Sequence, residues 1–410
     1  MASKLKNIII AYDCANINGG AAKVAIQSAI ALSNENYNVY FFAASGPIDD
    51  GLERSNVIVK CLGLNDINHG SKINAIKNGI WNKKVGQEFD AFLAAFSPEE
   101  TIVHIHGWAK ALSSAVVKVA CDKGFKTLIT LHDYFTLCPN GGFYDYQKQK
   151  ICTRKPMSLA CMFCNCDKRS YAQKAWRVAR QIVQDRTVRN NPNVAYISIS
   201  KKNEDAVRSK VKSKSFFRVN NPVQLGARQI EDCSKSKKYL YVGRLSEEKG
   251  IELFCQAITD LKADYAIEGI VVGDGVLYEK LKKEYPAIQF EGWKSPDEVQ
   301  EYIHSARALV LPSKCIEGAP LTIIEAMSVG LPCIVSDCTS AMELVEDGVN
   351  GFVFETGNIE SIKKKLVLSF NQSKIKSVQL TICDRFRADN YSIATHVRNL
   401  EKVYQSWMSQ

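Results

Sequence analysis

Runs of consecutive apolar residues alternate along the chain with stretches in which apolar residues recur every three or four positions. The continuous runs are typical of parallel strands covered on both faces, and the second pattern predicts amphipathic helices. In the first half we predict strands at Asn7–Tyr12, Val39–Ala43, Val57–Leu62, Thr101–His106, Thr127–Leu131, Ala195–Ser200 and Ser215–Val219. In the second half we predict them at Tyr239–Val242, Gly269–Val272, Ile288–Phe290, Ala308–Leu311, Cys333–Val335 and Phe352–Phe354. Because strand and helix alternate in both halves, the fold class is α/β with two doubly wound, Rossmann-like domains.

A polar stretch without a sustained period, residues 221–238, separates the two halves. We therefore expect a first domain over residues 1–222 and a second over residues 236–385, which suits a chain of 410 residues. The last segment, 390–410, has apolar residues at helical spacing and predicts an amphipathic helix.

Charge is unevenly distributed between the halves. The first 225 residues carry a net charge of +14 and the remainder −4, which together give the chain's +10. A basic half indicates an anionic partner, either nucleic acid or an anionic membrane surface. The sequence has no run of apolar residues long enough for a transmembrane helix and no signal-peptide pattern at its start, so we expect a cytoplasmic protein.

The stretch Leu311–Pro332, LPSKCIEGAPLTIIEAMSVGLP, carries the most specific chemistry. A buried strand leads into a loop with Glu317, and a helix that begins near Pro320 places Glu325 eight residues further on. A helix N-terminus offers free N–H groups and a favourable dipole to an anion. Two carboxylates for sugar hydroxyls beside a phosphate site indicate binding of a nucleotide sugar.

This stretch resembles the Glu-x7-Glu motif of retaining GT-B glycosyltransferases, family 4 in particular, through EGxP followed by EAMxxGxP. The resemblance implies a GT-B fold in which two Rossmann-like domains face a central cleft, the first binding the acceptor and the second the donor. It also implies that Glu317 contacts the donor sugar and Glu325 the donor ribose. By the same resemblance, donor binding falls to Glu317, Gly318, Ala319, Pro320, Leu321 and Glu325.

The loop after the first strand of the second half, GRLSEEKG at 243–250, places Arg244 and Lys249 five residues apart. It resembles the G-R-x4-K-G segment of the same family. Two cations directed at a leaving diphosphate would stabilise its developing charge without a metal. The alternative is that both are solvated surface charges.

Three further positions match the family's donor-binding loops. Gly19 and Gly20 open the first helix and would approach the diphosphate or the acceptor, although a plain tight turn explains them equally. Gly273 lies in the next glycine-containing loop, beside the expected nucleotide. Trp293 would flank the base, or else be an ordinary half-buried tryptophan.

Histidines occur at two strand ends of the first half. His104 and His106 alternate with Ile105, so both point to one face of the sheet. His132 and Asp133 end the next strand, and strand C-termini bind ligands in such sheets. The resemblance assigns catalysis to His132 with Glu317, Arg244 and Lys249, and the acceptor side to His106 and Asp133. No Asp-x-Asp motif ends a strand, so no catalytic metal is expected.

Five cysteines lie within 29 residues of a Pro- and Gly-containing stretch, 138–166. Four thiolates hold zinc tetrahedrally, and such a site would stabilise an insertion that lacks its own core. The predicted ligands of a structural zinc are Cys138, Cys152, Cys161 and Cys164. Cys166 would be spare, and the alternative is that all five remain thiols.

The segment 167–189 that follows is a basic helical pattern. Tyr171, Ala175, Val178 and Ile182 share one face, and Trp176 is close to it. Such a helix suits an anionic membrane surface, or packs on its sheet with a solvated outer face.

We therefore expect a retaining hexosyltransferase that moves a sugar from a UDP-sugar to a carbohydrate acceptor. The cationic first domain favours a lipid-linked acceptor at the inner membrane face, as in bacterial O-antigen, lipopolysaccharide or capsule assembly. One alternative is a GT-B nucleotide-sugar epimerase or hydrolase. The other is a non-catalytic nucleic-acid-binding protein, which would need a face of interleaved aromatic and basic residues. The basic residues of this chain are mostly spread singly along the sequence, so no nucleic acid is expected as a partner.

Overall fold

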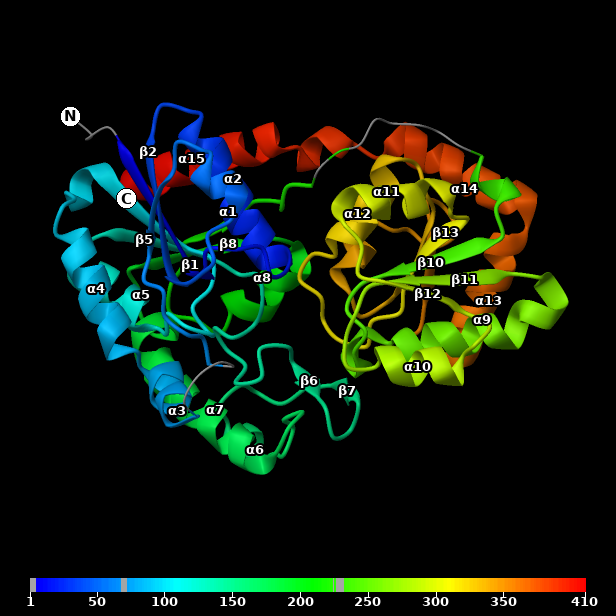
Figure 1. The fold of residues 1–410 in the computed structure, drawn as a ribbon, viewed down its shortest axis with the longest axis horizontal. Helices are drawn as coiled ribbons and strands as arrows, with labels where there is room; N and C mark the ends of the chain where they lie inside the picture. Colours follow the sequence, from blue (N-terminus) through cyan, green and yellow to red (C-terminus); the bar gives the residue numbers. More distant parts are fainter. Residues whose placement is uncertain (1–4, 68–71, 224, 226–231) are drawn as a thin grey trace. The chain divides into compact units, whose positions relative to one another are not determined.

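The computed structural model describes residues 5–67, 72–223, 225 and 232–410. The chain divides into two compact units, and each is described here by itself (Figure 1). Unit 1 holds the described residues of 1–142, 153–222 and 393–410, and unit 2 those of 143–152 and 223–392. Of the predicted linker, 221–238, residues 224 and 226–231 lie outside the described residues. None of the described helices is both long and apolar enough to cross a membrane.

Unit 1 is built on a seven-stranded sheet with the order β3-β2-β1-β4-β5-β8-β9, and all of its neighbouring strands are parallel. The strands are β1 (Asn7–Cys14), β2 (Asn38–Ser45), β3 (Ile58–Cys61), β4 (Thr101–Ile105), β5 (Lys126–Thr130), β8 (Val194–Ser198) and β9 (Phe216–Arg218). Strands β4 and β8 are buried along their whole length, which explains their continuous apolar runs. All seven strands predicted in this half are present.

The helices of unit 1 include one from the far end of the sequence. They are α1 (Gly20–Ser33), α2 (Asp50–Glu53), α3 (Lys72–Ile80), α4 (Lys83–Leu93), α5 (Ala115–Asp122), α6 (Leu159–Met162), α7 (Tyr171–Gln184), α8 (Lys201–Arg208) and α15 (Ile393–Met408). Helix α15 buries Leu400, Tyr404 and Trp407 in the core that α1 and β1 also form. The predicted terminal helix therefore packs on the first Rossmann-like sheet.

Unit 2 contains a six-stranded parallel sheet with the order β12-β11-β10-β13-β14-β15. Its strands are β10 (Lys238–Val242), β11 (Glu268–Val272), β12 (Gln289–Gly292), β13 (Ala308–Leu311), β14 (Cys333–Ser336) and β15 (Phe352–Phe354). Its helices are α9 (Ile251–Tyr265), α10 (Tyr278–Glu284), α11 (Pro296–Ser305), α12 (Leu321–Ser328), α13 (Ile359–Phe370) and α14 (Gln372–Arg385). A small hairpin, β6 (Tyr144–Asp145) with β7 (Lys150–Ile151), also groups with this unit, whereas the sequence had placed it in the first domain.

In each sheet the first strands in sequence are added on one side of the first strand, and the later strands are added on its other side. The reversal lies between β1 and β4 in unit 1 and between β10 and β13 in unit 2. Open parallel sheets bind ligands outside the carboxyl ends of their strands at such switch points. The residues that follow these four strands are therefore the candidates for the functional site.

Candidate active site

The two cations predicted to meet a diphosphate lie on one loop of unit 2 but have different partners. Arg244 has a side chain that is 67% exposed, and its Nη2 lies 3.0 Å from Glu248 Oε1. Lys249 is half-buried, and its Nζ lies 3.0 Å from Glu317 Oε2. Burial by itself would lower the pKa of Lys249, but the Glu317 carboxylate outweighs it, and the pKa is raised. Lys249 is therefore a permanent cation at this edge of the sheet.

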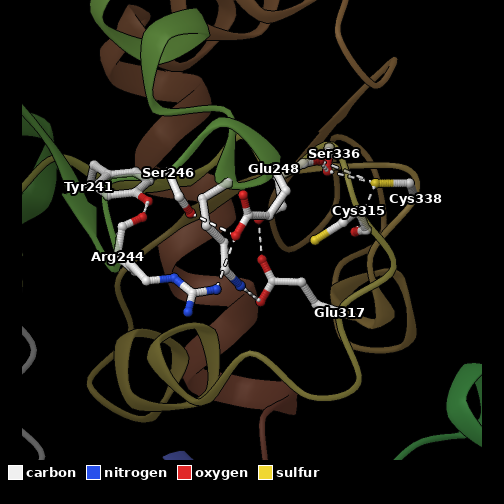
Figure 2. A network of polar contacts seen from close by, with 10 residues as sticks. Tyr241, Arg244, Ser246, Glu248, Cys315, Glu317, Ser336 and Cys338 are labelled. Carbon is white, nitrogen blue, oxygen red and sulfur yellow. Dashed lines mark hydrogen bonds and ion pairs between the residues drawn. The ribbon is translucent and has the colours of Figure 1, made fainter. Parts of the chain in front are cut away.

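Glu248 is a residue of this site that sequence reasoning did not single out. Its side chain is buried and accepts hydrogen bonds from Ser246 Oγ at 2.8 Å and from Arg244 (Figure 2). Its backbone oxygen accepts the N–H of Lys314 at 2.9 Å, which joins the loop after β10 to the loop after β13. The only local signal was a second glutamate between Arg244 and Lys249, so its role depends on tertiary contacts.

The loop that carries Glu317 is fixed from both sides. Ser313 Oγ donates to Glu317 Oε1, and the backbone oxygen of Ser313 accepts from Ser336 Oγ at 2.6 Å and from Cys338 Sγ at 3.2 Å. The last two residues come from the end of β14, as Figure 2 shows. The carboxylate of Glu317 is thus held between a hydroxyl and the Lys249 ammonium.

Helix α12 begins at Leu321, and Pro320 is its N-cap rather than a residue of its first turn. Pro320 provides no side-chain cap, and its backbone oxygen accepts the N–H of Ile323 in the first turn at 3.1 Å. Gly318, Ala319 and Leu321 are half-buried around this helix start, and Glu325 is half-buried one turn later. The arrangement retains the anion-binding potential that the sequence predicted.

The glycine-containing loops of unit 2 pack backbone against backbone. Gly250 has a φ of 67°, and a Cβ there would lie 1.9 Å from the backbone oxygen of Pro312. A Cβ at Gly273 would lie 2.0 Å from the backbone oxygen of Gly243. The loops after β10, β11 and β13 therefore pack tightly together and bring Gly273 close to the Arg244 loop. Trp293, directly after β12, is 74% exposed. It is therefore not the ordinary half-buried tryptophan that was the alternative to a base contact.

Tyr144 of the β6–β7 hairpin was also missed by sequence reasoning. Its side chain is buried, and among the described residues its hydroxyl has no hydrogen-bond partner. Burial raises the pKa of Tyr144, and Cys315 and Glu248 add to the effect through their charges. An unpartnered buried hydroxyl beside Glu248 points to a ligand contact in the predicted donor site.

In unit 1 the predicted histidines form one group at the ends of β4 and β5, in which His104 and His106 are buried and His132 is half-buried. The rings of His104 and His106 lie 4.2 Å apart between centroids, so both point to the same face as predicted. His106 Nδ1 lies 2.9 Å from His132 Nε2. His104 Nδ1 lies 2.7 Å from the hydroxyl of Tyr404 on α15, and its Nε2 lies 2.7 Å from Thr130 Oγ1. The contact of His106 with His132, both singled out from the sequence, and that of His104 with Tyr404 were not predicted.

These contacts determine which nitrogens carry protons. Burial lowers the pKa of His132 and of His104 to about 3, so both rings are neutral near pH 7. The buried Nε2 of His106 has no partner within the described part of the chain. An unpaired acceptor is less costly than an unpaired N–H, so we assign the proton of His106 to Nδ1, from which it donates to His132 Nε2. His132 then carries its own proton on Nδ1 as a hydrogen-bond donor.

Asp13, near the end of β1, fixes the loop that follows β4 through backbone hydrogen bonds. Its buried carboxylate accepts the backbone N–H groups of Lys110, Ala111 and Leu112 at 2.7–2.9 Å. A cavity of about 60 Å³ is lined by Asp13, His106, Trp108, Lys110, His132 and Asp133, among others. Asp13 was not predicted, because only the fold brings residues 110–112 to the end of β1.

Three predicted positions of unit 1, Gly19, Gly20 and Asp133, are exposed. Gly19 caps α1, and a Cβ added to it would meet nothing within 4 Å, so the space beside it is open. Gly20 is the first residue of α1 and is exposed. Asp133 is exposed at the rim and accepts the N–H of Phe135 at 2.9 Å.

The predicted zinc site is not assembled. Within residues 5–67, 72–223, 225 and 232–410, no three His, Cys, Asp or Glu side chains form a group that could hold a metal ion. The buried ammonium of Lys174 lies 4.0 Å from Cys161 Sγ and supplies a cation where the prediction placed zinc. The four cysteines therefore do not fit a tetrahedral site.

Comparison with known proteins bears on the second half most directly. Residues 227–378 match the family described as glycosyl transferases group 1. An uncharacterized glycosyltransferase of Haemophilus influenzae is 30% identical over 206 residues, which cover 49% of this chain and 56% of that protein. The UDP-Gal:alpha-D-GlcNAc-diphosphoundecaprenol alpha-1,3-galactosyltransferase of Escherichia coli is 30% identical over 181 residues, which cover 40% and 44%. The chain spans about half the length of these curated relatives.

Solved structures resemble both units. Anabaena HepE in complex with UDP-glucose matches with a TM-score of 0.66 at 15% identity, over 98% of this chain and 99% of that one. At this identity the likeness concerns the fold, and the neighbours are GT-B glycosyltransferases with two Rossmann-like domains. The chain therefore has the GT-B fold, and its residues 227–378 match the glycosyl transferases group 1 family.

Proposed function

We propose that this protein is a retaining glycosyltransferase that moves a hexose from a UDP-sugar to a lipid-linked carbohydrate acceptor in bacterial surface-polysaccharide assembly. The observation that carries the proposal is the Lys249–Glu317 ion pair beside Arg244, at the switch point of the sheet in unit 2. One edge of that sheet thus offers cations for a diphosphate and a carboxylate for a sugar. The family match of the same residues supports this donor role.

In the donor site, each charged group has a separate task. Arg244 and Lys249 neutralise the diphosphate as the bond from its oxygen to the sugar C1 breaks, together with the N-terminal end of α12, which has no side-chain cap. Glu317 accepts from hydroxyls of the donor sugar, and Glu325 from those of the ribose. Trp293, because it is exposed, is free to flank the base.

In the acceptor site, the neutral histidines provide hydrogen bonds rather than charge. His132 donates from Nδ1 to a sugar oxygen, and His106 fixes its ring by donating to Nε2. The acceptor hydroxyl forms the new bond to C1 on the face from which the diphosphate leaves and gives its proton to the departing diphosphate oxygen, so the anomeric configuration is retained. The lipid-linked acceptor is supported by the E. coli relative, whose name specifies a diphosphoundecaprenol-linked substrate.

The test is transfer by the purified full chain. It is incubated with a panel of UDP-sugars and a lipid-diphosphate-linked N-acetylglucosamine, and UDP release and the product's anomeric configuration are measured. We expect acceptor-dependent UDP release and a product with the donor's configuration. Conversion of one UDP-sugar into another, or release of free sugar alone, would favour the epimerase or hydrolase alternative, and an inverted product would contradict retention.

A further inference from the structure

Helix α7 carries its polar side chains inward and its apolar side chains outward. Along one face, within an arc of about 100°, it exposes Tyr171, Ala172, Ala175, Ala179 and Ile182. The buried side chains include Lys174, Arg180, Gln181 and Gln184. Val178, at the edge of the predicted apolar face, is buried. A helix that packs on a globular core normally has the opposite arrangement.

The inward face is polar because it holds the loops of the His132 cavity. Arg180 donates to the backbone oxygens of Ala109 at 3.3 Å and of Pro139 at 3.2 Å. Gln181 donates to the backbone oxygen of Thr136 at 3.3 Å, and Gln184 accepts from Trp108 Nε1 at 2.8 Å. These contacts fix the orientation of the helix, so its apolar side must face outward.

The neighbouring helices extend the exposed apolar side. On α6 and just after it, Leu159 and Phe163 are 72% and 71% exposed, and the Tyr171 hydroxyl donates to the backbone oxygen of Phe163 at 3.4 Å. On α3, Ile73 and Ile76 are exposed, and Trp176 Nε1 of α7 donates to the backbone oxygen of Ile76 at 2.9 Å. Figure 1 shows α3, α6 and α7 grouped at one edge of unit 1. We call this surface the apolar face; its large members are Ile73, Ile76, Leu159, Phe163, Tyr171 and Ile182.

The border of the apolar face is basic and its carboxylates are neutralised. Residues 153–190 contain nine Lys or Arg and two Asp. Asp167 pairs with Arg177 at 2.7 Å, and Asp185 pairs with Arg189 at 3.0 Å. The exposed basic residues of the border are Lys77, Lys155, Lys168, Arg169 and Arg186. Apolar side chains surrounded by cations complement a surface that is apolar inside and anionic outside.

We propose that the apolar face docks unit 1 on an anionic phospholipid bilayer, with Leu159 and Phe163 inserted among the lipids. Two weak signals, apolar insertion and attraction to anionic headgroups, combine to give stable but reversible binding. Helix α7 then lies between the bilayer and the His132 cavity, a separation of about one helix diameter, ~10 Å. This rests on the proposed function in one respect: the bilayer would present the diphosphate-linked end of the acceptor to that cavity.

The experiment is co-sedimentation of the full chain with vesicles of phosphatidylcholine alone and of phosphatidylcholine mixed with phosphatidylglycerol. We expect binding to the mixed vesicles that weakens as salt is added. Leu159→Glu with Phe163→Glu should reduce this binding at least about tenfold, since each change places a charge in the membrane interface. Arg169→Glu should weaken it about fivefold or more, because one basic residue contributes about that factor at an anionic surface. The controls are Leu380→Glu on α14 and Lys283→Glu on α10, which make the same changes at exposed positions of unit 2.

Each outcome is decisive. Unchanged binding of the double variant, or no binding of the unaltered chain to mixed vesicles, overturns the proposal. A dimer in solution that the double variant converts to a monomer would also overturn it, because a second copy would then cover the face. UDP affinity and donor hydrolysis are measured in parallel and should not change in the double variant. Vesicle binding without any sugar transfer would contradict the proposed function and leave the docking surface intact.

Discussion

Replacing Lys249 with methionine is the sharpest test of the donor site, because it removes a charge with little change in shape. At the observed 3.0 Å, Coulomb's law with an effective dielectric constant of about 20 gives an attraction of about 5 kcal/mol for the Lys249–Glu317 pair. The side chains remain 24% and 12% exposed, so solvent screening should reduce the measurable coupling to about 1–3 kcal/mol. Loss of the ammonium from the diphosphate should lower kcat/KM by about 100- to 1000-fold.

The coupling is measured with a double-mutant cycle of Lys249→Met and Glu317→Gln. Calorimetry identifies the thermal transition of unit 2 as the one that UDP shifts upward, and its stability changes give the coupling energy. The matched control is Lys280→Met with Glu252→Gln, a pair with the same 3.0 Å separation on the exposed surface of unit 2. That pair should couple by no more than about 1 kcal/mol and leave activity unchanged.

Two results would refute this reasoning about Lys249. A coupling no larger than that of the Lys280 control would show that Lys249 and Glu317 do not stabilise each other. A kcat/KM of Lys249→Met within about threefold of the unaltered enzyme, which is less than 1 kcal/mol, would exclude the diphosphate role.

Four further outcomes are expected. Glu325→Gln should fold normally but lose most transfer activity, because an amide accepts hydroxyl hydrogen bonds less strongly than a carboxylate; near-normal turnover would remove Glu325 from the ribose site. Glu248→Ala removes the carboxylate that accepts from Arg244 and should lower kcat/KM about tenfold, whereas Glu248→Gln keeps an acceptor and should partly restore it. Equal activity of the two variants would contradict a role of Glu248 in positioning Arg244. Tyr144→Phe should leave the melting temperature unchanged and raise KM for the UDP-sugar about fivefold, because the hydroxyl has no partner among the described residues; an unchanged KM would refute a ligand contact. With pKa values of about 3 when folded and about 6.5 when unfolded, His132 and His104 stay neutral while the unfolded chain takes up protons, so the stability of unit 1 should fall as pH drops below 6.5, with each of the two contributing about 1.4 kcal/mol per pH unit; a flat profile of the transition that UDP does not shift would contradict this.

Much of the site was visible in the sequence because it follows strand ends. The β10 strand is followed at once by Arg244 and Lys249, and the β13 strand by Glu317, so the parallel topology alone predicts that they meet at one edge. The shared face of His104 and His106 likewise follows from the two-residue period of a strand. These are local patterns, and the fold preserves them.

The cysteine segment shows where local pattern fails. Spacing alone favoured four thiolates around zinc, but the described residues form no group of three or more metal-ligating side chains, and Lys174 is buried next to Cys161. Whether sulfur atoms converge depends on the path of a loop whose backbone has no periodic hydrogen bonding to impose it. The same limit applies to Tyr144, since its two-residue strand gave no signal in the sequence.

By itself, the sequence determined the two doubly wound sheets, the edge of each sheet at which the candidate site residues lie, and the charged residues of the loop after β10. Apolar runs and glycine positions specify these through hydrogen bonding and packing within a few residues. Only the tertiary structure decided which groups form hydrogen bonds with the side chains of the candidate site. Arg244 donates to Glu248, Asp13 accepts from the backbone of residues 110–112, and His104 contacts the Tyr404 hydroxyl. It also turned the polar face of α7 inward, because buried loop carbonyls need donors, and a helix that supplies them must expose its apolar side instead.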